Sequence, residues 1–173
     1  GVDKPHVCTA YDVISGDVKV SGKVALIGSG ITGLECAEMM LNEGCQVAMV
    51  EMLDAVKLLE QSKSFTAKDS KQLQAWFGKL LNWILTSPQG QEESRQANNH
   101  STAYDAQVIA IALYTGNLKV AREVINAVPA KRIFTQIEPD GKQPLELERT
   151  TAFGYTLFNL THMLDMSFIG ATE

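Results

Sequence analysis

The sequence predicts a mixed fold, with an N-terminal α/β fragment followed by an all-α segment of helical hairpins. Two observations lead to this prediction. Within the first 54 residues, an apolar strand pattern, a glycine-rich turn, a helical pattern and a second strand pattern follow one another. From residue 55 onward, apolar residues recur at helical spacing, and short polar or glycine-containing connectors separate the runs. We therefore expect two domains, residues 1–54 and 55–173.

The composition of the two segments differs as sharply as their patterns. The formal net charge is −5, and all of it lies in residues 1–54, which hold 3 Lys or Arg against 8 Asp or Glu. Residues 55–173 hold 12 of each class and eleven of the twelve aromatic residues. An acidic balance argues against nucleic acid or an anionic membrane surface as a partner. No apolar run approaches the ~20 residues that a membrane span needs.

The cysteines and the N-terminus bear on compartment and metal binding. Cys8, Cys36 and Cys45 lie in the first segment, and none has the spacing of a metal site. Cys36 and Cys45 fall in apolar patterns, where free cysteine usually packs in a core. The N-terminus has neither the basic nor the apolar stretch of a signal peptide, so the chain as written is expected in the cytoplasm.

The first segment reads as a Rossmann-like βαβ fragment. Residues 23–28 form a short β-branched run that stops at glycine, residues 34–42 have helical spacing, and residues 46–50 form a second apolar strand. The glycine pattern G-x-G-x-x-G falls between the first strand and the helix, which is the context that dinucleotide binding requires.

Each residue of this pattern has a physical role in that interpretation. Gly28 permits the tight turn, Gly30 lets the backbone approach a pyrophosphate, and Gly33 lets the helix pack closely on the strand. The helix N-terminus offers free N–H groups to the phosphates. Glu51, at the end of the second strand, would accept hydrogen bonds from ribose hydroxyls, which favours NAD or FAD over NADP. The alternative is a glycine turn that binds no ligand.

The stretch TAYDVISGDVKVSGKVALIGSGITGLECAEMMLNEGCQVAMVEMLD resembles the nucleotide-binding part of NADH:flavin oxidoreductases of the old-yellow-enzyme/2,4-dienoyl-CoA reductase type. That family completes its sheet with further strands and carries its flavin chemistry on a barrel. The resemblance covers residues 8–54 and implies a nucleotide-binding corner without the hydride-transfer machinery.

The second segment predicts a series of helices with recognisable ends. Thr66 and Asp69 form a capping box, the helix that follows ends before Pro88, and residues 90–100 form a polar loop. Asn117 is placed to cap a helix that Pro129 breaks. The later helices are expected at residues 103–114, 118–128 and 153–168, with a short turn or two within 131–137.

Polar residues at the ends of these helices are the candidate functional groups. Asn99 and His100 lie where the polar loop enters an apolar helix, and Arg149 and Tyr155 flank the start of the last helix. Taken singly, such residues are more often structural. Aromatic residues that either pack in the core or stack on a ligand are Trp76, Trp83 and Tyr104. Polar residues that would shape a site are Gln136, Gln143 and Glu146.

Residues 58–164 closely resemble the alginate lyase family, whose fold is an α/α toroid. The resemblance is carried by N-N-H before Tyr-Asp-x-Gln, by Q-I-E-P-D-G-x-Q-P-x-E-L and by R-T-x-x-x-x-Y-x-x-x-N-L. It implies a partial toroid here, with Asn99, His100, Arg149 and Tyr155 on the active-site positions. It also implies an anionic polysaccharide, alginate or a related polyuronate, as substrate, and the family is usually periplasmic or secreted.

The implied reaction explains why these residue types are wanted. Uronate polymers are cleaved by β-elimination, in which a base removes the C5 proton and the C4 glycosidic oxygen leaves. Asn99, His100 and Arg149 would stabilise the anion that develops beside the carboxylate. Tyr155 would act as general acid toward the leaving oxygen and as base for one C5 epimer, and His100 as base for the other. This chemistry needs no metal or cofactor.

Two unrelated resemblances within one chain suggest a chimera of two fragments. Three functions remain open: a polysaccharide lyase acting on alginate, an NAD- or FAD-binding module, and an inactive helical scaffold. Apolar faces left without neighbours would favour self-association.

Overall fold

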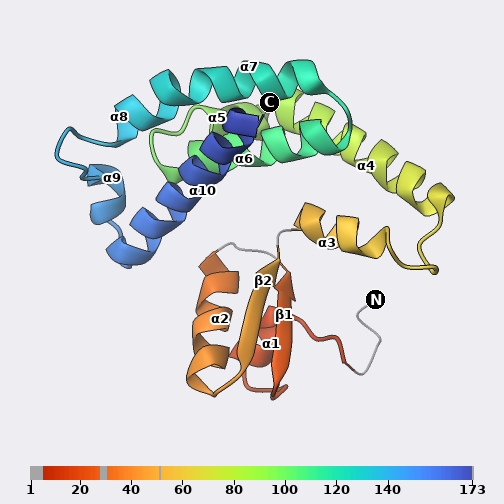
Figure 1. Ribbon diagram of the computed structural model, residues 1–173. Helices are drawn as coiled ribbons and strands as arrows, with labels where there is room; N and C mark the ends of the chain where they lie inside the picture. Colours follow the sequence, from red (N-terminus) through yellow and green to blue (C-terminus); the bar gives the residue numbers. More distant parts are fainter. Residues whose placement is uncertain (1–5, 28–30, 51, 173) are drawn as a thin grey trace. The chain divides into compact units, whose positions relative to one another are not determined.

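A computed structural model describes residues 6–27, 31–50 and 52–172 of the chain (Figure 1). The chain divides into two compact units, Gly1–Ser62 and Lys63–Glu173. The boundary that the sequence suggested, between residues 54 and 55, falls within a helix of the first unit, α3 (Met52–Leu59).

The first unit contains a strand–helix–strand arrangement, as the sequence predicts. Its elements in chain order are α1 (Ala10–Ile14), β1 (Lys23–Ile27), α2 (Ile31–Asn42), β2 (Gln46–Val50) and α3. The two strands pair in parallel, with Lys23 opposite Gln46 and Ile27 opposite Val50. The described residues contain these two strands and no others, and a two-stranded sheet does not support the prediction of a Rossmann-like fragment.

The predicted cysteine packing is confirmed in this unit. Cys36 and Cys45 are buried in a cluster with Val13 and Met40, and apolar residues of β1 pack against it. Burial raises the pKa of the Cys36 thiol, and the nearby Cys8 adds to the rise. The thiol therefore stays protonated and behaves as a small apolar group.

The predicted dinucleotide site lies largely outside the described residues. Gly28, Gly30 and Glu51 are not among them. Gly33 lies in the first turn of α2, which begins at Ile31, before the expected start at Leu34.

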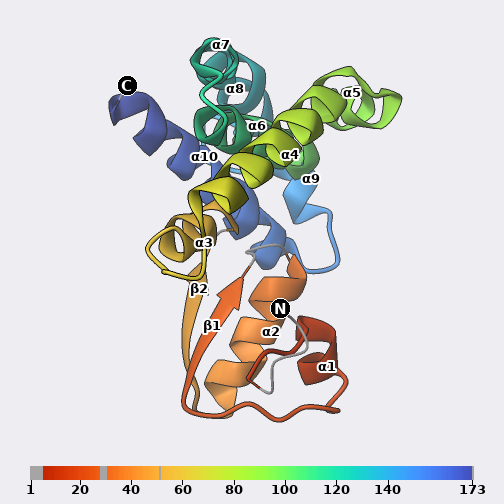
Figure 2. The same cartoon turned by 90° about the vertical axis from the view of Figure 1, so that its right-hand side faces the viewer.

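The second unit is all-α, as predicted (Figures 1 and 2). Its α6 is central, because α4, α5, α7 and α10 all pack against it. A core cluster of Ile109, Val128 and Met166 joins α6, α7 and α10. The elements in chain order are α4 (Ala67–Thr86), α5 (Pro88–Ser94), α6 (Asn99–Tyr114), α7 (Leu118–Val128), a π-helical turn (Pro129–Ile133), α8 (Phe134–Gln136), α9 (Pro144–Leu147) and α10 (Ala152–Thr172).

The start of α4 confirms the predicted capping box. The Asp69 carboxylate accepts hydrogen bonds from Thr66 Oγ1 at 2.6 Å and Thr66 N at 2.8 Å. These bonds, the side-chain bond first, lower the pKa of Asp69 below its usual value. The charged carboxylate is therefore fixed at the N-terminus of α4, where the helix dipole also favours it.

The segment expected to be a polar loop is partly helical. α5 begins at Pro88, a residue well suited to the first position of a helix because its missing N–H has no intrahelical partner there. Ser87 Oγ accepts from Gly90 N at 3.1 Å and caps this helix. The sequence prediction treated Pro88 as a stop, whereas it ends one helix and starts the next.

The prediction that Pro129 breaks its helix is wrong. Pro129 has a helical φ of −55° and begins a π-helical turn, so the chain stays helical from α7 through to α8. The Phe134 N–H donates to the Pro129 carbonyl, and this wider turn follows a residue that has no N–H of its own to bond.

Among the described helices, none is long and apolar enough to cross a membrane.

Candidate active site

Asn99 and His100 occupy the first turn of α6. The helix begins at Asn99, earlier than predicted, because the side chain of Asn98 caps it by accepting from His100 N at 3.3 Å. The Glu146 carboxylate of α9 accepts from Asn99 N at 2.6 Å and from Asn99 Nδ2 at 2.5 Å. Both residues are buried. A carboxylate at a helix N-terminus is favourable, and it fixes the Asn99 amide while leaving the second Nδ2 proton free to donate.

His100 is held from a different helix. Its Nδ1 lies 2.9 Å from Glu93 Oε2 on α5, and the two side chains are 47% and 49% exposed. A carboxylate oxygen accepts a hydrogen bond, so Nδ1 carries the proton in this pair. Nε2 is then the ring nitrogen available to take or give a proton.

Arg149 and Tyr155 are in direct contact. The Arg149 guanidinium carbon lies 4.1 Å from the centroid of the Tyr155 ring, a cation–π arrangement. Arg149 also connects to the first pair, because its backbone N–H donates to the Glu146 carbonyl at 3.2 Å. Asn99, Glu146, Arg149 and Tyr155 thus form a continuous series of contacts from the start of α6 to the start of α10.

A buried network of side-chain amides joins α8, Gln143 at the start of α9, and α10. Asn159 Nδ2 donates to Gln136 Oε1 at 2.9 Å and to Gln143 Oε1 at 2.8 Å. Gln136 Oε1 also accepts from Thr102 Oγ1 at 3.1 Å, which brings in α6. Asn159 lies one helical turn after Tyr155, so the network fixes the helix that carries Tyr155.

A buried ion pair fixes the other side of α6. Arg132 Nε donates to Asp105 Oδ2 at 2.7 Å and Arg132 Nη2 to Asp105 Oδ1 at 3.2 Å, with side chains 9% and 7% exposed. Arg132 Nη2 also donates to the Ser94 carbonyl at the end of α5 at 3.0 Å. The π-helical turn therefore ties α6 to α5, the helix that carries Glu93.

Of the three aromatic residues considered for stacking, Tyr104 is half-buried. Its hydroxyl donates to the Ile84 carbonyl at 3.4 Å. Burial raises the pKa of the Tyr104 phenol, the Asp105 carboxylate adds to the rise, and Arg132 acts in the opposite direction. Tyr104 is therefore a neutral structural phenol, whereas Trp76 and Trp83 are exposed.

The described residues include no group of three or more His, Cys, Asp and Glu side chains placed to hold a metal ion. The candidate site is instead made of amides, one imidazole, one guanidinium and one phenol. Such groups donate hydrogen bonds and move protons.

Sequence reasoning named Asn99, His100, Arg149 and Tyr155, and the structure brings three of them into one series of contacts. It also named Gln136, Gln143 and Glu146 as groups that shape a site, and all three are buried in the hydrogen bonds described above. It missed Glu93 and Asn159. Asn159 could have been identified from the sequence, because it lies four residues after Tyr155 on the same predicted helix and belongs to the motif R-T-x-x-x-x-Y-x-x-x-N-L.

Comparisons with known proteins add an independent finding. A crystal structure of an alginate lyase from Bacteroides ovatus superposes with a TM-score of 0.68 and 58% sequence identity, over 70% of this chain and 32% of that one. A bilirubin reductase from Mediterraneibacter gnavus (strain CC55_001C) is 41% identical over 64 residues, which are 37% of this chain and 10% of that protein. The chain therefore spans about a third of the lyase and a tenth of the reductase.

The match at the level of families is broader. The family model described as "Alginate lyase" matches residues 20–172. The matched range includes the predicted junction near residue 54. The comparisons do not support a chimera, nor do they support membership of the NADH:flavin oxidoreductase family, and both stay predictions. Because the lyase model covers most of the sequence, this chain belongs to the alginate lyase family.

Proposed function

We propose that the second unit carries the active site of a polyuronate lyase, which cleaves alginate or a related polymer by β-elimination. The observation that carries the proposal is the series of contacts from Asn99 through Glu146 and Arg149 to Tyr155. Family membership supports it, and the solved relative with 58% identity is described as an alginate lyase. The chain spans about a third of that relative, so activity, substrate and products are all part of the proposal.

The first requirement of the reaction is to make the C5 proton acidic. The substrate carboxylate beside C5 must be neutralised so that negative charge can move onto it as the proton leaves. Asn99 supplies an N–H that Glu146 has already oriented, and Arg149 supplies a fixed positive charge. Preorganised donors of this kind stabilise the developing anion without reorganising during the reaction.

The second requirement is a base for the C5 proton and an acid for the C4 oxygen. Tyr155 protonates the leaving oxygen, and as base it takes the proton of one C5 epimer. His100 takes the proton of the other epimer through Nε2, because Glu93 holds the proton on Nδ1. The guanidinium stacked on the Tyr155 ring restricts the rotation of that ring. No electron acceptor is involved, since one C–H bond and one C–O bond break as a C=C bond forms.

The test is to incubate the folded chain with alginate and to follow the ultraviolet absorbance of the unsaturated uronate product. Tyr155→Phe should lower the rate by about a hundredfold or more, since positioned acid–base groups contribute about 10²- to 10⁴-fold. Tyr11→Phe is the matched control, because Tyr11 is exposed and lies in the first unit. A folded chain that leaves alginate intact would instead favour the inactive helical scaffold.

We also propose that the first unit is an NAD- or FAD-binding module. Its parallel β1–α2–β2 arrangement supports this. Titration with NADH should change the nicotinamide fluorescence, and Gly30→Ala should abolish the change. Gly78→Ala is the control, because a Cβ at this position on α4 meets no atom within 4 Å. No response in the unsubstituted chain would contradict the proposal.

A further inference from the structure

One face of α4 exposes aromatic and basic side chains that the proposed lyase site does not use. We call it the α4 outer face, and it consists of Lys68, Gln72, Trp76, Lys79 and Trp83. Spacings of four, four, three and four residues place them along one stripe of the helix. The stripe is turned away from the packed side of α4, which buries Phe77, Leu81 and Ile84. Trp76 and Trp83 are 54% and 52% exposed, unusual for the largest apolar side chain.

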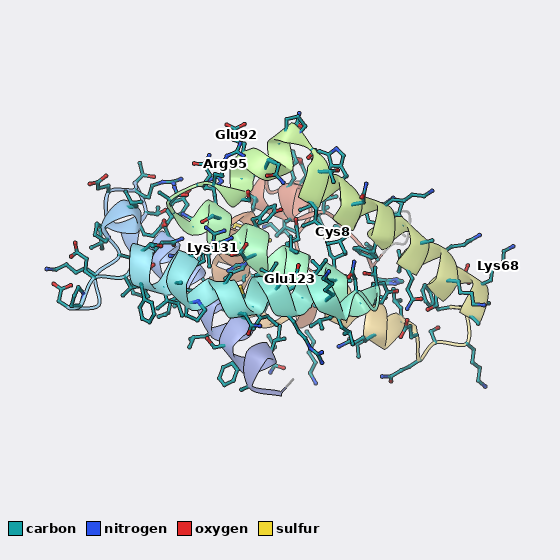
Figure 3. All side chains as sticks on the ribbon, turned by 90° about the horizontal axis from the view of Figure 1, so that it is seen from above. Cys8, Lys68, Glu92, Arg95, Glu123 and Lys131 are labelled. Atoms are coloured by element: carbon teal, nitrogen blue, oxygen red, sulfur yellow. The ribbon has the colours of Figure 1, made fainter. Side chains whose placement is uncertain are left out.

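This face is positively charged. The face holds Lys68 and Lys79, and Lys71 lies beside it on the same helix. The one acid of α4 is Asp69, whose carboxylate is bonded back to Thr66. Within the described part of the chain, these three lysines form no ion pair. Lys68 extends outward from the start of the helix (Figure 3). A surface hollow of about 410 Å³ lies at this end of α4, lined by Ala67, Lys68, Lys71, Gln72 and Ala75.

The indole rings are spaced and supported for stacking. Seven residues separate Trp76 from Trp83, which is about 10 Å along the axis of a helix and close to the length of two pyranose units. Trp76 is held edge-on against the buried Phe77, with ring centroids 5.0 Å apart, and Phe77 is held in turn by Tyr114 at 5.3 Å. A ring supported in this way loses little freedom when a ligand stacks on it.

The C-terminal end of α4, which carries Trp83, adjoins the helices that carry Glu93 and His100. The Trp83 carbonyl accepts from Ser87 N at 2.8 Å, and Ser87 caps α5, which carries Glu93. The neighbouring Ile84 carbonyl accepts from Tyr104 in α6, one turn beyond His100. Figure 2 shows α4 crossing the second unit and leading into α5.

We propose that the α4 outer face binds a segment of polyuronate chain beyond the bond to be cleaved. Trp76 and Trp83 stack on alternate sugar rings, and Lys68 and Lys79 pair with uronate carboxylates. Sugar faces are apolar and their carboxylates anionic, so a stripe of indoles and ammonium groups complements both. The choice of polyuronate rests on the proposed function, but binding here does not require cleavage.

Tryptophan fluorescence tests this directly, because Trp76 and Trp83 are the two tryptophans of the chain. The full chain carrying Tyr155→Phe, so that ligand is not consumed, is titrated with alginate hexasaccharide. We expect a saturable change in emission and protection of both indoles from iodide quenching. Trp76→Phe and Trp83→Phe report on each ring alone. Lys79→Gln should weaken binding about threefold or more at low salt, whereas Lys119→Gln on α7, with its ion pair to Glu123, should not.

Several outcomes would overturn the proposal. Unchanged emission while calorimetry detects alginate binding would place the ligand elsewhere. An equal response to neutral dextran would show that the lysines do not select an anionic polymer. An emission change that follows protein concentration rather than ligand would identify the face as a contact between copies. The unsubstituted chain is assayed for cleavage in parallel, so cleavage without a fluorescence change rejects this surface alone, and a fluorescence change without cleavage rejects the lyase proposal alone.

Discussion

At the scale of single residues, Glu93 decides how His100 can act. A carboxylate that accepts from Nδ1 selects the tautomer in which Nε2 is the basic atom. In Glu93→Gln the amide accepts or donates equally well, so both tautomers become populated. Under the proposed mechanism, kcat for the uronate epimer assigned to His100 is expected to fall by about tenfold or more, with KM little changed, because tautomer control is worth at least that much in other acid–base sites.

Two measurements separate this effect from a loss of folding. Nitrogen NMR of the imidazole should show a change of tautomer at His100 in Glu93→Gln, and Glu93→Asp should restore part of the activity. Glu92→Gln is the control, since Glu92 is the exposed neighbour on α5 (Figure 3). An unchanged tautomer, or an equal loss in the control, would show that Glu93 does not position His100.

Some residues of the candidate site could be identified from the sequence, and one could not. Asn99, Arg149 and Tyr155 were identified through family motifs, since an isolated amide, guanidinium or phenol carries no signal of its own. Glu93 could not be found in this way. Its contact with His100 depends on α5, a helix that the sequence presented as a polar loop, and on the angle at which α5 meets α6.

At the scale of elements, the turn after α7 explains a wrong prediction and supports a stability prediction. Pro129 was expected to end the helical run, but the π-helical turn that it begins presents Arg132 to Asp105. The helix before Pro129 was predictable from periodicity, whereas no local pattern predicts the π-helical turn or the pairing of Arg132 with Asp105.

Removal of one partner of this pair should strongly destabilise the second unit. Arg132→Met leaves the Asp105 carboxylate buried without its cation, a situation that costs about 3–5 kcal/mol. The double variant Arg132→Met with Asp105→Leu removes both charges, so it should recover most of the loss. Urea unfolding followed by helical circular dichroism measures both. Arg95→Met, at an exposed arginine that follows α5 in the same unit, is the comparison. Equal stability of the single and double variants would contradict the argument.

At the scale of the whole molecule, the two compact units meet between Ser62 and Lys63, whereas the composition and the residue period of the sequence change near residue 54, within α3. The strand–helix–strand order of the first unit follows from residue spacing, as do the long helices α4, α6, α7 and α10 of the second, whereas α5 was expected to be a polar loop. The sequence patterns did not predict that one family covers most of the chain. The lyase family model begins at residue 20 and includes strands that the patterns assigned to another family.

The last helix carries a prediction about the state of the molecule in solution. Five large apolar side chains of α10 are exposed along one stripe, with spacings of four, three, four and four residues: Phe153, Leu157, Leu160, Leu164 and Phe168. Their spacing approaches that of a coiled-coil seam, and a stripe of this length favours association with a second helix of the same kind. We therefore predict that the chain self-associates at micromolar concentration.

Sedimentation velocity over a range of protein concentrations measures this association. Leu157→Lys combined with Leu164→Lys places two like charges on the stripe, two turns apart, and should shift the molecule to monomer without loss of helical content. The control is Leu118→Lys with Leu145→Lys, two exposed leucines on α7 and α9 that lie off the stripe. If the unsubstituted chain sediments as a monomer throughout, the stripe does not join copies of the chain. If the control dissociates as readily, the association depends on general apolar exposure, because the loss of any two exposed leucines then has the same effect as the loss of two from α10.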